Sequence, residues 1–494
     1  MGDGTDHRMT RLDATRALLG AASLLALGAC TTAQVDVAQP TVEVPADWQV
    51  VGPPPISVDV TEYWTLLDDP LLTQFVEQAI EENRDLATSA ARLDQARASL
   101  RQARAGYLPS VTGSAGANRA VGSGTSDDFF FDIGADAQWE LDLFGQISGN
   151  VLASEADLAA QGFSLADLQR LIVGQVAIAT INARATAEQL AIAEATLVIQ
   201  DDNLQIARWR NEAGLVSSLD VEQARTQRAQ TAATIPQLES SLVATANSIS
   251  TLIGEPPGRV LALLTLQAAP VPGPPELDGF EAPAEVLRRR PDVRAAEASL
   301  VSSTARIGVA RAQLLPLVRL SGSIGTGPTT AGNLFDLVTG GLFAGVSQLL
   351  FDGGRTRAQV DSAEAGARAA LAQWEQTILG ALEDVETSAV DRQTATERVI
   401  LTDEVLDAAN TTALLARSQY EAGLTDFQTL LVAENNLLSA RNQLVSAEAA
   451  RANAFVRLTQ ALGGGWTELD LDIPQVVEAD FDTDPDDAAT DRTE

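Results

Sequence analysis

The tetrapeptide Glu212-Ala213-Gly214-Leu215 recurs as Glu421-Ala422-Gly423-Leu424, 209 positions later. Each copy lies between two long segments rich in Ala, Leu and Gln. A glycine directly after such a segment is a typical helix stop, because glycine adopts the left-handed conformation at little cost. Each copy therefore predicts the bend of a helical hairpin.

Other landmarks repeat at nearly the same offset. Leu108-Pro109 matches Leu315-Pro316, and Leu143-Phe144 matches Leu350-Phe351. A whole set of elements that recurs at a fixed offset indicates internal repetition. The unit is too long for a solenoid, so the sequence predicts a duplicated half-protein.

The predicted domain organisation follows from these landmarks and from changes in composition. We expect, in chain order, a lipoprotein-type signal peptide (1–29), a lipidated tether (30–65), the first repeat (66–254), a linker or equatorial segment (255–283), the second repeat (284–463), and a C-terminal equatorial segment with an acidic disordered tail (464–494).

Composition excludes several classes of function. The 494-residue chain carries a formal net charge of −34, and all of its basic residues are arginines. This acidic balance argues against nucleic acid as a partner. The sole histidine is His7 and the sole cysteine is Cys30, so the body of the chain offers no His-based acid–base chemistry, Cys nucleophile, disulfide or His/Cys zinc site. We expect no enzyme activity, metal or cofactor.

The N-terminus has the pattern of a secretory leader. Basic Arg11 and Arg16 precede about 13 mostly apolar residues at 17–29, too few to span a bilayer as a helix. The end of this run, Leu27-Gly28-Ala29-Cys30, resembles a bacterial lipobox, which predicts cleavage before Cys30 and its lipidation. The alternative is an ordinary signal peptide with an incidental cysteine. A tether rich in Pro and Val follows.

Helical periodicity covers most of the remaining chain. Between 71 and 108 an apolar residue recurs every seven positions, which predicts a helix that packs on another helix and stops at Pro109. Long helices are also expected at 147–210, 219–253, 285–315, 353–420 and 425–462. The first of these would extend roughly 95 Å.

Two-residue periodicity replaces the helical period in four segments, near 111–118, 129–143, 318–324 and 341–351. The segment 129–143 places Phe131 and Ile133 on one face and four acids on the other. These acids are Asp132, Asp136, Glu140 and Asp142. A soluble hairpin would bury the apolar face on a core and expose the acids as solvated surface. A hairpin in an outer membrane would turn the apolar face to lipid and the acids to a wet lumen. The leader favours lipid.

Four such strands cannot stand alone in a membrane, because lipid tolerates no unpaired strand edge. The smallest common closed barrel needs about eight strands. Several chains must therefore contribute to one barrel, although this argument does not choose between two, three or more.

The whole pattern resembles the TolC-like outer-membrane efflux proteins, and within them the lipidated NodT/OprM-like branch. The resemblance spans 30–466 and rests on the bend from Arg210 to Asp220, which matches R-x-x-x-G-x-x-S-x-x-D. It also rests on Arg290-Pro291-Asp292-Val293 and on Gln348-Leu349-Leu350-Phe351-Asp352-Gly353-Gly354.

The resemblance implies a mainly α-helical homotrimer in the outer membrane. Its 12-stranded β-barrel, with four strands per chain, would continue into a long periplasmic α-barrel. Such a protein is the passive exit duct of a tripartite multidrug or small-molecule pump. Its expected partners are a periplasmic adaptor and an inner-membrane transporter, RND-type in the first place. The alternatives are the duct of a type I protein secretion system and a periplasmic coiled-coil scaffold lipoprotein.

The resemblance also assigns residues to the hairpin tips. Adaptor contacts are expected at Arg210, Gly214, Leu215, Ser217, Asp220, Tyr420, Gly423, Leu424 and Asp426. The alternative is that the glycines only allow the turns, while Ser217 and Asp220 cap the next helix. Some relatives close the periplasmic mouth with Asp pairs at positions that hold Thr429 and Val432 here. That acidic ring is therefore not carried over, and Asp220 and Asp426 become the candidate gate acids.

Overall fold

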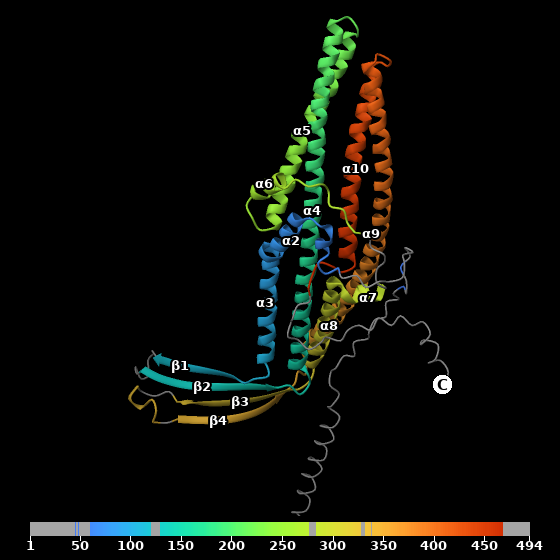
Figure 1. Ribbon diagram of the computed structural model, residues 1–494. Coiled ribbons are helices and arrows are strands. Elements are labelled where there is room, and N and C mark those ends of the chain that lie inside the picture. The colour runs from blue at the N-terminus through green and yellow to red at the C-terminus, as the bar shows by residue number, and fades with distance from the viewer. Residues whose placement is uncertain are drawn as a thin grey trace, which may run out of the picture.

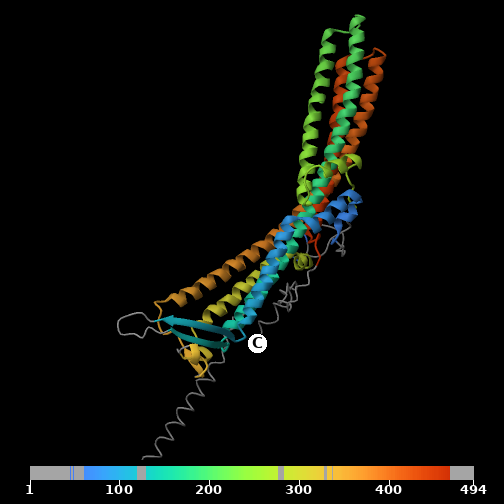
Figure 2. The same ribbon diagram turned by 90° about the vertical axis from the view of Figure 1, so that its left-hand side faces the viewer.

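The computed structural model describes residues 60–119, 129–275, 283–327, 331–336 and 338–467, together with Pro45 and Trp48. A four-stranded sheet lies at one end, and two helical hairpins extend far from it to the opposite end (Figure 1). The two hairpins run side by side, and their bends lie at the same end in both views (Figure 2). The expected combination of long hairpins with a small sheet is thus present in the structure.

The two halves contain matching elements in the same order. The first half consists of η1 (Tyr63–Leu67), α2 (Pro70–Glu82), α3 (Arg84–Ala105), β1 (Ser110–Arg119), β2 (Phe129–Leu141), α4 (Gln146–Glu212) and α5 (Ser218–Leu252). The rest consists of α6 (Arg259–Leu266), α7 (Pro283–Arg289), α8 (Pro291–Ala312), β3 (Leu317–Thr326), η2 (Ala331–Asn333), β4 (Val338–Ser347), α9 (Arg355–Glu421) and α10 (Phe427–Ala461). Both α4 and α9 have 67 residues, and both α5 and α10 have 35. The predicted duplication is confirmed.

Two helices that the sequence predicts as continuous are broken. The helix expected over 71–108 is interrupted at Asn83, whose side chain accepts hydrogen bonds from the N–H groups of Asp85 (2.8 Å) and Leu86 (3.0 Å) and so starts α3. The helix expected over 285–315 is interrupted at Arg290, because Pro291 disfavours helical backbone in the residue before it. The predicted linker also contains a helix, α6.

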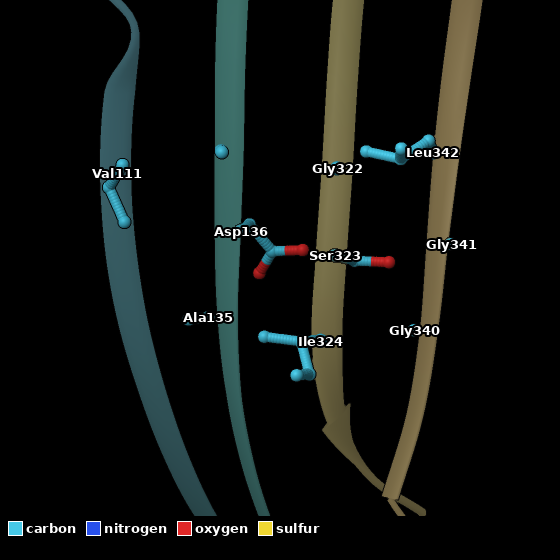
Figure 3. Close-up of a pocket in the computed structure, with 10 residues that line it drawn as sticks. Val111, Ala135, Asp136, Gly322, Ser323, Ile324, Gly340, Gly341 and Leu342 are labelled. Carbon is cyan, nitrogen blue, oxygen red and sulfur yellow. The ribbon is translucent and has the colours of Figure 1, made fainter.

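The sheet is antiparallel, with strand order β1-β2-β3-β4. Residues that pair across strands share a face, so the pairs Val111–Ala137 and Gly322–Leu342 extend one apolar face over all four strands. Small residues leave a shallow hollow in the middle of this face, with a volume of about 620 Å³ (Figure 3). The predicted strand 341–351 is wrong at its end, because β4 stops at Ser347.

The largest apolar core lies where α2, η1, α4, α5, α6 and α10 meet, midway along the long helices. Tyr63, Phe75 and Phe455 are fully buried there. The buried guanidinium of Arg184 on α4 forms an ion pair with Asp69, at 3.0 Å, which in turn caps α2. This core fixes the sheet at one end of the helices relative to the bends at the other.

The sheet itself lacks a core within one chain. Leu342 is 95% exposed, and Val346 and Val111 are also mostly exposed. The outer edges of β1 and β4 have no partner strand among the described residues. An exposed apolar face with two free edges indicates that other surfaces cover it.

Candidate functional site at the hairpin tips

Both bends use the same backbone geometry. At the first, Gly214 has φ of 68°, and the N–H of Leu215 donates to the carbonyl of Arg210 at 2.8 Å. At the second, Gly423 has φ of 73°, and the N–H of Leu424 donates to the carbonyl of Gln419 at 2.8 Å. These are Schellman-type ends, in which glycine avoids the strain that a side chain would add.

The helices that follow the two bends, α5 and α10, differ in the position of the acidic residue at their N-terminal cap. At α5, the carboxylate of Asp220 accepts from the backbone N–H of Ser217 at 3.3 Å. At α10, the carboxylate of Asp426 accepts from the N–H (2.8 Å) and the hydroxyl (2.7 Å) of Thr429. In the first repeat the acid, Asp220, lies three residues after the N-cap residue Ser217. In the second repeat the acid, Asp426, is itself the N-cap residue. Both arrangements satisfy an N–H group that the helix leaves unpaired.

Acidic pH should weaken the N-terminal cap that Asp426 provides for α10. Hydrogen bonds from Thr429 hold the pKa of Asp426 below its ordinary value. A lowered pKa stabilises the folded tip above the unfolded value of about 3.9, and this contribution is lost as pH falls through the lower folded value. We measure the hydrogen-exchange rate of the Thr429 amide in the unchanged protein and in the Asp426→Asn variant. The ratio of the first rate to the second should be constant down to about pH 4 and should rise below it. Asparagine also caps helices but does not titrate. A ratio independent of pH would contradict this.

Arg210 joins the two tips. Its guanidinium donates to the carbonyl oxygens of Tyr420 (3.1 Å) and Glu421 (3.3 Å), and its Cζ lies 4.3 Å from the centre of the Tyr420 ring. A cation at the C-terminus of α9 interacts favourably with the helix dipole and with the aromatic face. Arg210 thus holds the first hairpin to the second within one chain.

Tyr420 is buried rather than presented on the tip surface. Its side chain packs on Phe427 with ring centres 5.4 Å apart, inside an apolar cluster formed by α4, α5, α9 and α10. Sequence reasoning missed this burial, because the periodicity of α9 does not reveal that α4, α5 and α10 pack around Tyr420.

Each tip exposes a large apolar side chain next to its glycine. Leu215 is 74% exposed and Leu424 is 79% exposed, at equivalent positions of the two bends. Trp209 and Leu219 add exposed apolar surface beside the first bend. Exposed apolar side chains that surround a rigid, capped backbone are typical of a protein–protein contact.

Below the tips the two hairpins meet along a polar seam. On α4, Asn182, Gln189, Asn203 and Arg210 stand at positions separated by multiples of seven. Each of the first three bonds a side chain of α10: Asn453 (3.0 Å), Ser446 (3.1 Å) and Glu434 (2.5 Å), respectively. The carboxylate of Glu434 also accepts from Arg417 on α9 at 2.8 Å. Side-chain hydrogen bonds therefore join the two hairpins beside the apolar clusters that also span them.

The candidate gate residues are distributed around the start of α5 and α10. Asp220 and Asp426 use their carboxylates in capping, and Thr429 donates to Asp426. Val432 is 48% exposed on α10.

Three of the four alternating acids share the polar face of the sheet. Asp132, Asp136 and Glu140 alternate with the apolar residues of β2, and Glu140 lies 3.7 Å from Arg319 on β3. Asp142 is different. It follows the end of β2, and its carboxylate accepts from the N–H groups of Ile147 and Ser148 at the start of α4. Its assignment to the strand's acidic row is therefore wrong.

Comparisons with known proteins agree with this architecture. A family model described as "Outer membrane efflux protein" matches residues 75–255 and 282–464. The chain is 30% identical to "Nodulation protein T" of Rhizobium leguminosarum bv. trifolii, over 83% of this chain and 89% of that protein. It is also 30% identical to "Solvent efflux pump outer membrane protein SrpC" of Pseudomonas putida, over 90% and 97%. The solved structure of the outer-membrane channel OprN superposes with a TM-score of 0.77, at 33% identity, over 87% of this chain and all of that one. Cys30 lies outside the described residues.

Proposed function

Because the chain belongs to the outer membrane efflux protein family, we propose that it forms one third of the exit duct of a tripartite small-molecule efflux pump. Substrates pass through it without covalent chemistry, from a periplasmic adaptor and an inner-membrane transporter to the exterior. The proposal includes a lipid anchor on Cys30 that holds the chain to the outer membrane. The relative SrpC is the outer membrane protein of a solvent efflux pump, which supports small molecules as the cargo.

The observation that carries this proposal is the two-faced, open-edged sheet. One face is continuously apolar, and the other carries acids and hydroxyl groups. In a barrel the first face contacts lipid and the second lines water. Four strands per chain leave two edges open, and three copies close them into 12 strands. The acids at Asp132, Asp136 and Glu140 then favour cations in the lumen.

The hairpin tips form the docking surface for the adaptor. They lie at the end of α4 and α9 opposite to the sheet (Figure 1), so a sheet in the outer membrane places them deep in the periplasm. Leu215 and Leu424 supply two exposed anchors on rigid bends. Three chains present six such tips. The opposite capping of α5 and α10 makes the two kinds of tip chemically unequal.

The same region is the place for a gate. The polar seam between the hairpins exposes hydrogen-bonding groups when it opens, and water can replace those bonds at little cost. The Arg210 contact with Tyr420 and Glu421 crosses this seam nearest the mouth. Asp220, Asp426, Thr429 and Val432 form the adjoining rim.

Cysteine crosslinking tests the tip assignment. With a bifunctional reagent in intact cells, Ser217→Cys and Thr425→Cys should each capture a periplasmic adaptor, because both positions flank the exposed bends. Ser240→Cys, exposed on α5 far from the bend, serves as the matched control and should capture much less. Equal capture at Ser240, or none at either tip, would remove the adaptor role from these residues.

A further inference from the structure

Within the described strands, the polar face of the sheet carries one large apolar side chain well inside a strand. Phe343 is the sixth residue of β4, and it pairs with Ser321 of β3, which pairs in turn with Gln138 of β2. Residues that pair share a face, so Phe343 lies on the side of the sheet that carries the acids. Phe130 and Leu317 share this face, but each lies within the first two residues of its strand.

Small residues surround the Phe343 ring. Gly341 and Gly345 are its neighbours on the same face of β4, and Ser321 lies directly opposite. A Cβ atom added at Gly345 would lie 2.7 Å from Cε1 of the ring, so the ring occupies the place of a side chain at that position. A Cβ atom added at Gly341 would meet nothing within 4 Å. The ring therefore leans along the wall toward Gly345 and is open toward Gly341, in agreement with an exposed fraction of 69% for Phe343.

A neighbouring copy leaves the ring exposed as well. In the proposed barrel the free edge of β4 faces β1 of the next copy. The polar face of β1 carries Ser110, Thr112, Ser114, Gly116 and Asn118. None of these side chains is longer than that of asparagine, so whichever of them lies beside Phe343, the ring still faces the lumen. An exposed phenyl ring in water is a surface on which apolar groups pack favourably.

The charges beside this ring pair with each other. Arg319 lies opposite Gly345, and its guanidinium is 3.7 Å from the carboxylate of Glu140. Asp136 lies two strands away from Gly341 (Figure 3), a separation of about 10 Å. The ring is thus the apolar centre of a locally neutral patch on a wall that is otherwise acidic. Such a patch suits uncharged molecules, because a charged group loses more hydration when it packs on an apolar surface.

We propose that Phe343 is a transient binding site for uncharged aromatic cargo inside the barrel. The ring of the cargo packs on the exposed side of the Phe343 ring, next to Gly341, while its polar groups bond water or the hydroxyl of Ser321. Three copies of the chain provide three such sites at one level of the lumen. This rests on the proposed duct and adds to it a preference among the molecules that pass.

A purely structural role for the ring has different consequences. An aromatic ring laid over a glycine stabilises a strand. In that case the stability of the barrel would depend on Phe343, but contacts of molecules in the lumen would not. An experiment that measures contact in the lumen, rather than stability, therefore separates the two roles.

Thiol labelling beside the ring measures this contact. Gly341→Cys places a thiol on the open side of Phe343. Outer membranes that contain the full-length protein are treated with two uncharged methanethiosulfonates of similar size, one benzyl and one cyclohexylmethyl. The ratio of the benzyl rate to the cyclohexylmethyl rate reports the preference for an aromatic group. It is measured with Phe343 and after Phe343→Ser, Phe343→Leu and Phe343→Trp. The chain without an added cysteine controls for reaction at Cys30.

The ratio should fall by about threefold or more when Phe343 is replaced by Ser or Leu, and it should persist with Trp. Phe343→Leu keeps an apolar side chain, so it tests the aromatic contact even if Phe343→Ser lowers assembly. Asp132→Cys is the matched control, six residues along β2 from Gln138 on the same face. Its ratio should not respond to residue 343. An equal ratio at position 341 with and without the aromatic ring overturns the site, and so does an equal change at both positions.

A charged reagent separates failure of the site from failure of the duct. Trimethylammonium-ethyl methanethiosulfonate should label Gly341→Cys about tenfold faster than Leu342→Cys, because a thiol in an apolar environment stays protonated and unreactive. If this difference is found but the benzyl ratio does not depend on Phe343, the duct stands and the site is refuted. If both positions are labelled equally fast, the proposed barrel is refuted together with the site.

Discussion

Leu342→Arg is expected to destabilise the membrane-inserted protein by about 2–4 kcal/mol, the cost of an arginine on the lipid face near the bilayer midplane. Leu342 lies in the middle of β4 on the apolar face, and it is 95% exposed within one chain. Lipid therefore contacts this side chain directly in the proposed barrel. The assay is the urea midpoint of the trimer extracted from outer membranes, with the amount of assembled protein as a second readout.

Ser323→Arg is the matched control. Ser323 lies on the neighbouring strand, on the opposite face, and pairs with Asp136. An arginine there enters the aqueous lumen beside a carboxylate, so the midpoint should change little. If Ser323→Arg is as damaging as Leu342→Arg, or if both are tolerated, the assignment of the apolar face to lipid is wrong.

Arg290→Ala should cost about 1–3 kcal/mol, because it leaves the buried carbonyl of Ala461 without this donor and removes the cation beside two partly exposed carboxylates. The Arg290 side chain is 2% exposed, and its guanidinium contacts Asp292 (2.6 Å), Asp384 (3.0 Å) and the carbonyl of Ala461 (3.0 Å). It joins the start of α8 to α9 and to the end of α10. Thermal unfolding of the detergent-solubilised protein, followed by far-UV circular dichroism, measures the effect.

Arg288→Ala provides the comparison within the same arginine run. Its ion pair with Glu285 is largely exposed, and such pairs contribute about 0.2–1 kcal/mol. The expected order is a large loss for Arg290→Ala and a small one for Arg288→Ala. Similar losses for both would show that Arg290 does not hold these helices together.

The sequence predicts best those structural elements that a residue pattern within a short stretch of the chain defines. The bends at Gly214 and Gly423 follow from glycine after a helical run, and the long helices from an uninterrupted period. The strands follow from alternation, and the duplication from repeated landmarks. Each of these signals lies within a few residues of the structure that it specifies, so a single chain reveals it.

The features that sequence did not reveal depend on partners outside the residue's own helix or strand. The adaptor contact at Arg210 stays a prediction, whereas its bonds to carbonyls about 210 positions away are not visible in the sequence. Asn83 interrupts a helix whose seven-residue apolar pattern continues across the break, because it caps α3 and donates to the carbonyl of Leu252 at 2.7 Å. Asp142 fits the strand alternation, yet it caps a helix. In each case the neighbouring helix, rather than the local pattern, decides the role of the residue.

The mass of the complex extracted intact from outer membranes tests the central claim most directly. Native mass spectrometry should give a particle of three chains, each with a lipid modification on Cys30. A single chain, or recovery of the protein in the soluble periplasmic fraction, would contradict the proposal that this sheet is one third of a membrane barrel.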